Sequence, residues 1–280
     1  MSLIFPIGAS VLQAGSYTLD KVVLSLKKVT YKTYIGISFP LIFLITLIIF
    51  FIFRPPLSLS LFSGKFLYLI VILIVLTIFT NILFYRALDA DKVNEIQTLS
   101  LLGQVSLIIF TSIIFISERK PAIVFLALIC SLSVIWAHWK KNHIQIAKKT
   151  KLYLLWTIFI SPFSMIIIKI LLETWNPISL ELVRIGFVAL ILCPLFLRFE
   201  KKASAKAFLL LVITNILTTI AWILYFFSYQ KLGIIQTVLI FSVQPLLVYF
   251  ASIFLLKEKL HWKKFVSFLI ILTSIIVSRS

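Results

Sequence analysis

The chain has few charged residues and very little cysteine or histidine. Only 13% of its 280 residues are charged, nine are acidic, two are cysteine and three are histidine. Cys130 and Cys193 both fall within long apolar runs, which excludes a disulfide framework and a thiol pair with metal-ligand spacing. The apolar runs also lack an HExxH motif, a carboxylate pair and a Ser-His dyad. We therefore expect no metal site, no cofactor and no enzymatic activity.

Apolar surface dominates instead. The chain is 61% hydrophobic with a mean hydropathy of +1.14, more than a globular core could hide, so lipid must be its solvent. A helix needs about 20 apolar residues to cross a bilayer. Ten segments fit: 3–26, 34–53, 66–87, 93–116, 121–139, 152–172, 178–197, 206–229, 233–256 and 262–278. The first lacks a small-residue cleavage site, which predicts a retained helix.

Positive charge is spread over the short connectors between these segments. The net charge is +18, but no long basic segment or RNA-binding aromatic motif accompanies it, so we expect no nucleic-acid partner. Connectors after odd-numbered segments carry 18 Lys and Arg residues, against six on the opposite side. The positive-inside rule then puts both termini outside. We expect a multi-pass protein of the cell membrane, with the lipid bilayer as a partner.

A repeat connects the two halves of the chain. Only six Glu and seven Gln occur in the whole sequence, so a shared register of such rare residues indicates duplication. At a fixed step of 140 residues, Tyr85, Gln104 and Glu118 recur as Tyr225, Gln244 and Glu258.

The duplication predicts how the chain is divided and inserted. Residues 1–140 and 152–280 each contain five predicted segments, and the basic connector 141–151 separates them. Because five is odd, the two copies must insert in opposite orientations, as in many secondary transporters. We predict an all-α integral membrane protein with ten transmembrane helices in two inverted five-helix repeats. The rival interpretation is a helical bundle duplicated only for packing.

Several short motifs resemble those of a known family. Phe84 to Leu88, Ser117 to Lys120 and Gln244-Pro245 occur in an order and spacing similar to the drug/metabolite transporter superfamily, EamA-like branch. The first copy departs from the family by having Val105 where Pro is common, and no Arg mirrors Arg184. The resemblance implies a ten-helix transporter of small organic solutes. Nucleotide-sugar relatives imply cytosolic termini, opposite to the charge count.

Polar side chains recur at helical spacing within several of the apolar segments. They are costly in lipid and usually face a protein interior or a water-filled path. We predict a solute-binding site from these candidates: Gln13, Tyr17, Asp20, Asn81, Gln97, Gln104, Asn215, Trp222, Tyr225 and Gln244. The alternative is that such side chains only hold helices together through weak hydrogen bonds.

Four charged residues are predicted to be structural. Glu118 and Glu258 close the fourth and ninth segments, where the helix dipole disfavours an anion, and neighbouring Arg and Lys residues are the expected compensation. Glu181 and Arg184, spaced i and i+3, are expected to pair along the seventh segment.

The sequence favours one function and leaves others open. We predict a secondary transporter or exchanger of small organic solutes, such as metabolites, amino acids or drugs, working by alternating access. The alternative is a flippase for lipids or lipid-linked sugars, and a scaffold is a third possibility. Asp20 is the carboxylate of the first segment that proton coupling could use. The solute, direction, coupling ion and oligomeric state stay open.

Overall fold

Each of the ten predicted segments contains a helix or two consecutive helices in the computed structural model. The structure describes residues 3–26, 29–57, 62–138, 147–196, 204–256 and 262–277, and these ranges contain no strand. The helices are α1 (Ile4–Leu24), α2 (Tyr31–Phe53), α3 (Gly64–Ala90), α4 (Val93–Ile114), the 3-10 helix η2 (Ile116–Glu118), α5 (Pro121–His138), α6 (Lys148–Phe159), α7 (Ser161–Leu171), α8 (Pro177–Phe196), α9 (Ala205–Leu232), α10 (Ile234–Phe241), α11 (Gln244–Leu256) and α12 (Trp262–Val277).

Length and composition mark some of these helices as membrane spans. Five segments qualify: α2, α3, α9, Pro177–Pro194 of α8, and Ile234–Ala251 across α10 and α11; the bent pair α6–α7 makes a sixth. Shorter apolar helices occur in α4, α5 and α12. The protein is therefore a helical multi-pass membrane protein, and the ten crossings stay a prediction.

Large apolar side chains cover the outside of the bundle. Phe51 and Phe53 of α2, Tyr68 of α3 and Leu190 of α8 each expose more than three-fifths of their surface. In water this would favour aggregation, but lipid tails are a suitable solvent for such side chains, and the helices satisfy their own backbone groups.

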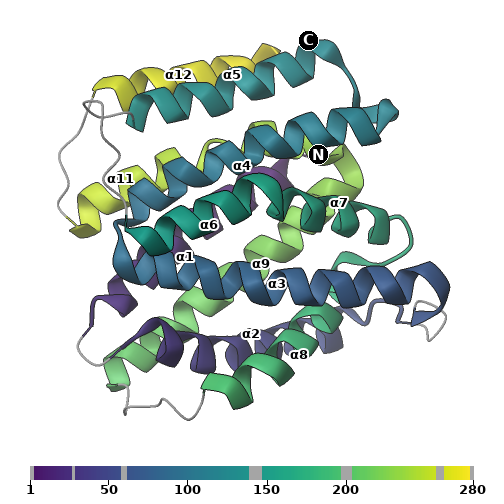
Figure 1. The fold of residues 1–280 in the computed structure, drawn as a ribbon, viewed down its shortest axis with the longest axis vertical. Coiled ribbons are helices and arrows are strands. Elements are labelled where there is room, and N and C mark those ends of the chain that lie inside the picture. The colour runs from purple at the N-terminus through teal and green to yellow at the C-terminus, as the bar shows by residue number, and fades with distance from the viewer. Residues whose placement is uncertain are drawn as a thin grey trace.

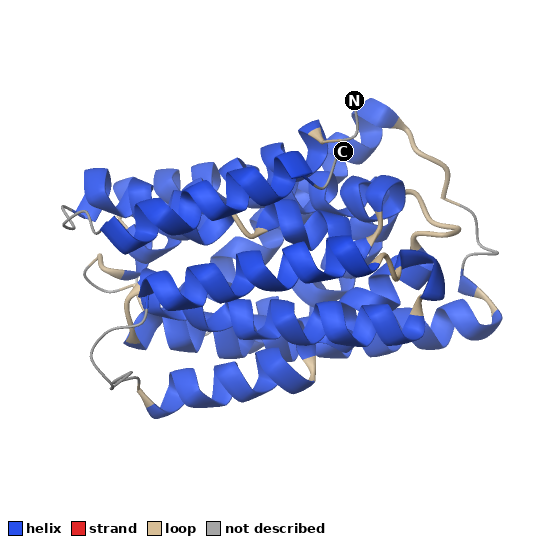
Figure 2. Cartoon of the chain, turned by 90° about the horizontal axis from the view of Figure 1, so that it is seen from above, coloured by secondary structure: helices blue, strands red, loops and turns tan. Residues whose placement is uncertain are grey.

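The helices form a layered bundle (Figure 1). α5 and α12 pack together at one edge, α2 and α8 at the opposite edge, and the other helices lie between. The start of α1 and the end of α12 lie toward the same end of the bundle in both views (Figure 2). An even number of crossings would give this arrangement.

The two halves pack reciprocally. α1, the first helix of the first half, packs on α9, α10 and α11 of the second half. α6 and α7, which open the second half, pack on α3 and α4 of the first. The opening segment of each half therefore lies against the third and fourth segments of the other.

A lysine stabilises an equivalent helix end in each half. Lys21 of α1 donates through Nζ to the carbonyls of Leu88 and Asp91 at the end of α3, at 2.7 and 2.8 Å. Lys169 of α7 donates to the carbonyl of Tyr229 near the end of α9, at 2.9 Å. A cation is favourable at such a position because the last carbonyls of a helix form the negative end of its dipole.

The last residues of the predicted basic connector are helical. We predicted a connector over 141–151, but α6 begins at Lys148. Asp91, at the end of α3, accepts hydrogen bonds from the backbone N–H of Ala147 at 3.0 Å and from the Thr150 hydroxyl. This carboxylate binds the first turn of α6, where N–H groups lack helical partners, and so extends the helix backwards.

Two predicted spans are interrupted. α6 ends at Phe159, and α7 starts at Ser161 after a bend of 43°. α10 ends at Phe241, and α11 starts at Gln244. Pro162 and Pro245 are the second residues of α7 and α11, and proline cannot donate to the carbonyl of the preceding turn. In membrane proteins such irregular backbone is tolerated where it lines a cavity.

Candidate functional site

A cavity of about 190 Å³ lies in the middle of the bundle, between the two halves. Its wall includes residues of α1, α2, α3 and α4 from the first half. The second half contributes residues of α6, α7, α8, α9, α10 and α11. Both interrupted spans reach it, through Ser161 and Pro162 at one break and Phe241 and Gln244 at the other.

Most of the predicted solute-binding residues surround this cavity. Eight of the ten line it: Gln13, Tyr17, Asn81, Gln97, Gln104, Trp222, Tyr225 and Gln244. Asp20 and Asn215 are buried elsewhere, against neighbouring helices. The structure thus brings the polar faces of several segments together, and their role in binding solute stays a prediction.

The repeat-related glutamines connect the two halves at the cavity wall. Gln104 of α4 accepts a hydrogen bond through Oε1 from the Ser242 hydroxyl, at 3.3 Å. Gln244 of α11 donates through Nε2 to Oε1 of Gln97 on α4, at 3.4 Å. Both bonds are long, so each amide can exchange its partner for a solute at small cost.

Aromatic rings cover other parts of the wall. Tyr225 packs against Phe241, with ring centroids 4.6 Å apart, and edge-on against Trp222 at 5.7 Å. Tyr17 packs against Phe84 at 5.2 Å. Polar tips on apolar rings suit solutes that combine an apolar body with a few hydrogen-bonding groups.

The predicted ion pair of α8 exists, and it also lines the cavity. Arg184 donates through Nε to Glu181 Oε2 at 2.9 Å, and through Nη2 to Oε1 at 2.9 Å and Oε2 at 2.6 Å. Its guanidinium lies 5.1 Å from the ring centre of Trp222. Both members are almost fully buried, with Glu181 at 0% exposure and Arg184 at 6%. The pair therefore lies in the cavity wall as well as within α8, and its structural role stays a prediction.

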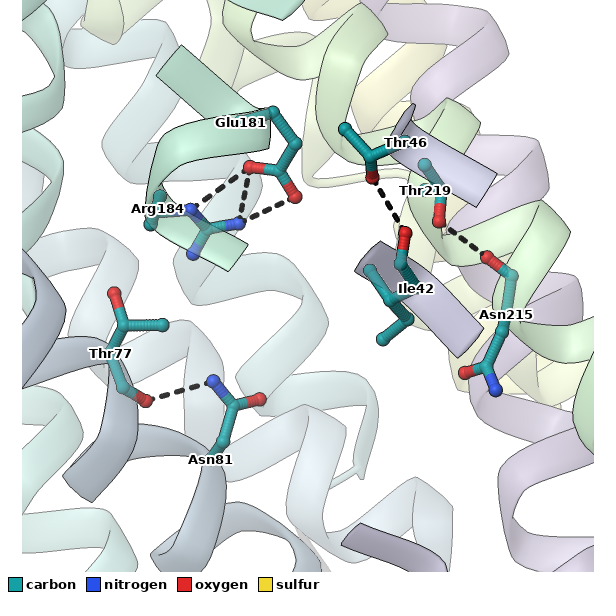
Figure 3. A network of polar contacts seen from close by, with 8 residues as sticks. All are labelled: Ile42, Thr46, Thr77, Asn81, Glu181, Arg184, Asn215 and Thr219. Carbon is teal, nitrogen blue, oxygen red and sulfur yellow. Dashed lines mark hydrogen bonds and ion pairs between the residues drawn. The ribbon is translucent and has the colours of Figure 1, made fainter. Parts of the chain in front are cut away.

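Figure 3 shows this pair across from α3. There Asn81 donates through Nδ2 to the carbonyl of Thr77 at 2.8 Å, one helical turn away. All four residues belong to the cavity wall. Asn81 and Thr77 thus share the cavity with Glu181 and Arg184. Among the described lining residues, these two are the ionised side chains, and their charges are opposite. The two charges of this part of the wall therefore balance each other.

Asn215 lies in a different environment. Its carbonyl accepts from the Thr219 hydroxyl at 2.7 Å, while its side-chain oxygen and nitrogen have no hydrogen-bond partner among the described residues (Figure 3). It is 1% exposed and does not reach the cavity.

Glu118, which we predicted to be structural, has other partners than expected. Its Oε2 accepts from the backbone N–H groups of Ile234 and Ile235, at 2.7 and 3.1 Å, and its Oε1 lies 3.7 Å from Lys169 Nζ. Instead of adjacent cations, the N-terminus of α10 compensates this charge. A carboxylate from the first half thereby caps a helix of the second. Glu258, its counterpart in the repeat, lies outside the described residues.

Part of the wall was not among the predicted residues. Tyr153 and Thr157 of α6, and Ser161 and Ser164 of α7, line the cavity next to the bend. Their signal is the Ser-Pro pair at residues 161 and 162, which marks a break within an apolar run. Among the residues that the structure describes, no cluster of three or more His, Cys, Asp or Glu side chains could hold a metal ion.

Comparisons with known proteins agree with the fold. A crystal structure of another protein is similar to this chain, with a TM-score of 0.74 at 13% sequence identity, covering 99% of this chain and 96% of that one. Such low identity shows a shared fold alone. No curated protein matches the sequence. The model of the EamA-like transporter family matches residues 148–280, which contain α6 to α12. This second part of the chain is therefore similar to the EamA-like transporter family, which is part of the drug/metabolite transporter superfamily.

Proposed function

We propose that the protein is a secondary transporter or exchanger that moves a small organic solute through the central cavity by alternating access. The family is one of small-solute transporters in membranes. The observation that carries the proposal is that both halves, and both interrupted spans, line the same cavity. Rocking one half against the other would open such a site to each side of the membrane in turn.

Ten crossings in two inverted repeats form part of this proposal. The reciprocal packing of α1 against α9 and of α6 and α7 against α3 supports a pseudo-twofold relation. The lysines at the ends of α3 and α9 support it independently, because each half uses the same contact. With this topology, the cell membrane is the expected location.

The size of the cavity favours a small metabolite over a lipid. Sites for drug-sized ligands usually measure about 300–1,000 Å³. The cavity measures about 190 Å³, and amides, hydroxyls and aromatic rings line it. A lipid-linked sugar would need a larger site with a polar end and an apolar end, so we place the flippase second.

Solute flux in proteoliposomes tests the proposal. Purified protein is reconstituted into lipid vesicles, and the vesicles are loaded with radiolabelled amino acids, nucleosides, sugars or amphipathic amines. Efflux of each solute is compared with its efflux from protein-free vesicles. We expect protein-dependent efflux of at least one small solute. Movement of a fluorescent phospholipid in the absence of any solute flux would favour the flippase instead.

The repeat-related glutamines give a sharper prediction. Gln104→Leu and Gln244→Leu are each expected to reduce flux by about tenfold or more, because each removes one cavity hydrogen bond worth about 1–2 kcal/mol with a solute. Both variants should fold, because the amides make only long bonds to protein. The matched control is Gln230→Leu, which removes a bond to the Leu172 carbonyl away from the cavity. Unchanged flux in both cavity variants would contradict the assignment.

A further inference from the structure

Asp20 is a buried carboxylate whose charge has no described counterion. It is 1% exposed, within the predicted first span. Its Oδ1 accepts from the Tyr34 hydroxyl of α2 and from the Thr214 hydroxyl of α9, both at 2.5 Å. Its Oδ2 has no hydrogen-bond partner among the described residues. An isolated ionised carboxylate is costly to bury, so a proton is the simplest compensation.

Uncharged groups surround this carboxylate on every packed side. The titratable groups facing it are the phenols of Tyr17 on α1, Tyr34 on α2 and Tyr85 on α3. α9 contributes the Thr214 hydroxyl, and no described cation of α4, α10 or α11 pairs with it. Neighbouring Lys21 instead binds carbonyls at the end of α3. Protonation would therefore remove a charge that the described groups leave unpaired.

A chain of hydroxyls connects Asp20 to the cavity. Thr218 of α9 lines the cavity and hydrogen-bonds to the Ser16 hydroxyl of α1. Ser16 Oγ lies 3.0 Å from Thr214 Oγ1, which in turn donates to Asp20. Thr214 Oγ1 also lies 3.0 Å from the Ser16 backbone carbonyl, but the carboxylate, at 2.5 Å, is the nearer acceptor. Because each hydroxyl has one proton, donation by Thr214 to the carboxylate orders the chain from Thr218 through Ser16 to Thr214. Such an ordered chain can pass a proton in either direction.

We propose that Asp20 is a proton-binding site in contact with the cavity through Thr218, Ser16 and Thr214, and that its protonation is coupled to transport. When the cavity opens to water, one proton leaves the water and the carboxylate becomes a neutral carboxylic acid. When the cavity opens to the opposite side, the acid returns the proton by the same route. The coupling rests on the proposed transport function, whereas the proton site itself does not.

Infrared spectroscopy of the purified protein in nanodiscs tests the site without any solute. We expect wild-type protein to show a protonated-carboxyl band whose intensity falls as the pH is raised. The band should be lost in Asp20→Asn, shifted in Asp20→Glu, and unchanged in the control Glu173→Gln, whose carboxylate is exposed. A band that persists in Asp20→Asn, or the absence of a titrating band from folded wild-type protein, would overturn the proposal.

Deuterium exchange tests the route. After mixing with D₂O, the Asp20 carboxyl band should shift about tenfold more slowly in Thr218→Val than in wild type, because one relay hydroxyl is missing. Thr219→Val is the matched control, since this neighbouring buried hydroxyl bonds the Asn215 carbonyl outside the chain. Equal exchange rates in Thr218→Val and wild type would overturn the relay through Thr218.

Flux measurements separate coupling from transport itself. For any solute that the wild-type protein moves, an imposed pH gradient should change the flux, and Asp20→Asn should lose this dependence. If the flux through wild-type protein does not change with the pH gradient, coupling is refuted and the transport function is not. Absence of all flux would refute the transport function and the coupling, while the infrared band still decides the proton site.

Discussion

Arg184→Met is expected to destabilise the protein by about 3–5 kcal/mol, the largest effect that we expect of any single substitution in the cavity wall. The change would leave Glu181 as an uncompensated carboxylate at 0% exposure. It would also remove the guanidinium from the faces of Trp222 and Phe226, which lie 5.1 and 5.4 Å away. Thermal unfolding in detergent, followed by tryptophan fluorescence, measures the loss.

A double variant separates charge pairing from packing. Glu181→Met combined with Arg184→Met removes both charges, so it should recover most of the lost stability, because apolar residues can replace a buried pair. Flux should not recover, because the cavity wall would lose its described ionised groups. If the Arg184→Met variant unfolds at the wild-type temperature, the buried pair does not stabilise the protein as we expect.

Gly103→Ala is expected to destabilise the protein by about 1–3 kcal/mol through overpacking. A Cβ at this position of α4 would overlap the Thr157 methyl group of α6 and lie 2.6 Å from the Thr157 carbonyl oxygen. Backbone cannot move as easily as a side-chain end, so α4 and α6 would have to separate. Small residues allow this kind of close helix approach in membranes.

A second glycine provides the matched control. A Cβ at Gly15 of α1 would meet only Leu217 Cδ1, at 3.5 Å, which is an ordinary contact. Gly15→Ala should therefore unfold within about a degree or two of wild type, whereas Gly103→Ala should unfold several degrees lower. Equal unfolding temperatures for the two variants would contradict the close contact between the halves at Gly103.

The helices were predictable because lipid imposes a strong constraint on sequence. Ten apolar runs of suitable length each contain helical structure. The interruptions at Ile160 and at Ser242-Val243 were not predicted, because average hydropathy does not register a missing backbone hydrogen bond. Pro162 and Pro245 carried that information, and in both places the break lies at the cavity.

The site was predictable only in part. Helical spacing placed Gln13, Tyr17 and Asp20 on one side of α1, but spacing cannot say which neighbour each side chain meets. In the structure, Gln13 and Tyr17 reach the cavity while Asp20 faces α2 and α9. Likewise, the spacing of Glu181 and Arg184 predicted their pairing, but their place in the cavity wall depends on long-range packing.

Thiol accessibility at Gln104 tests alternating access most directly. Gln104→Cys is placed in a background with Cys130→Ala and Cys193→Ala, and a membrane-impermeant thiol reagent is added to right-side-out cells or to inside-out vesicles. Because Gln104 lines the cavity, alternating access predicts labelling from both sides, and a transported solute should slow both reactions. Labelling from one side alone, unaffected by solute, would contradict a cavity that opens in turn to each side of the membrane.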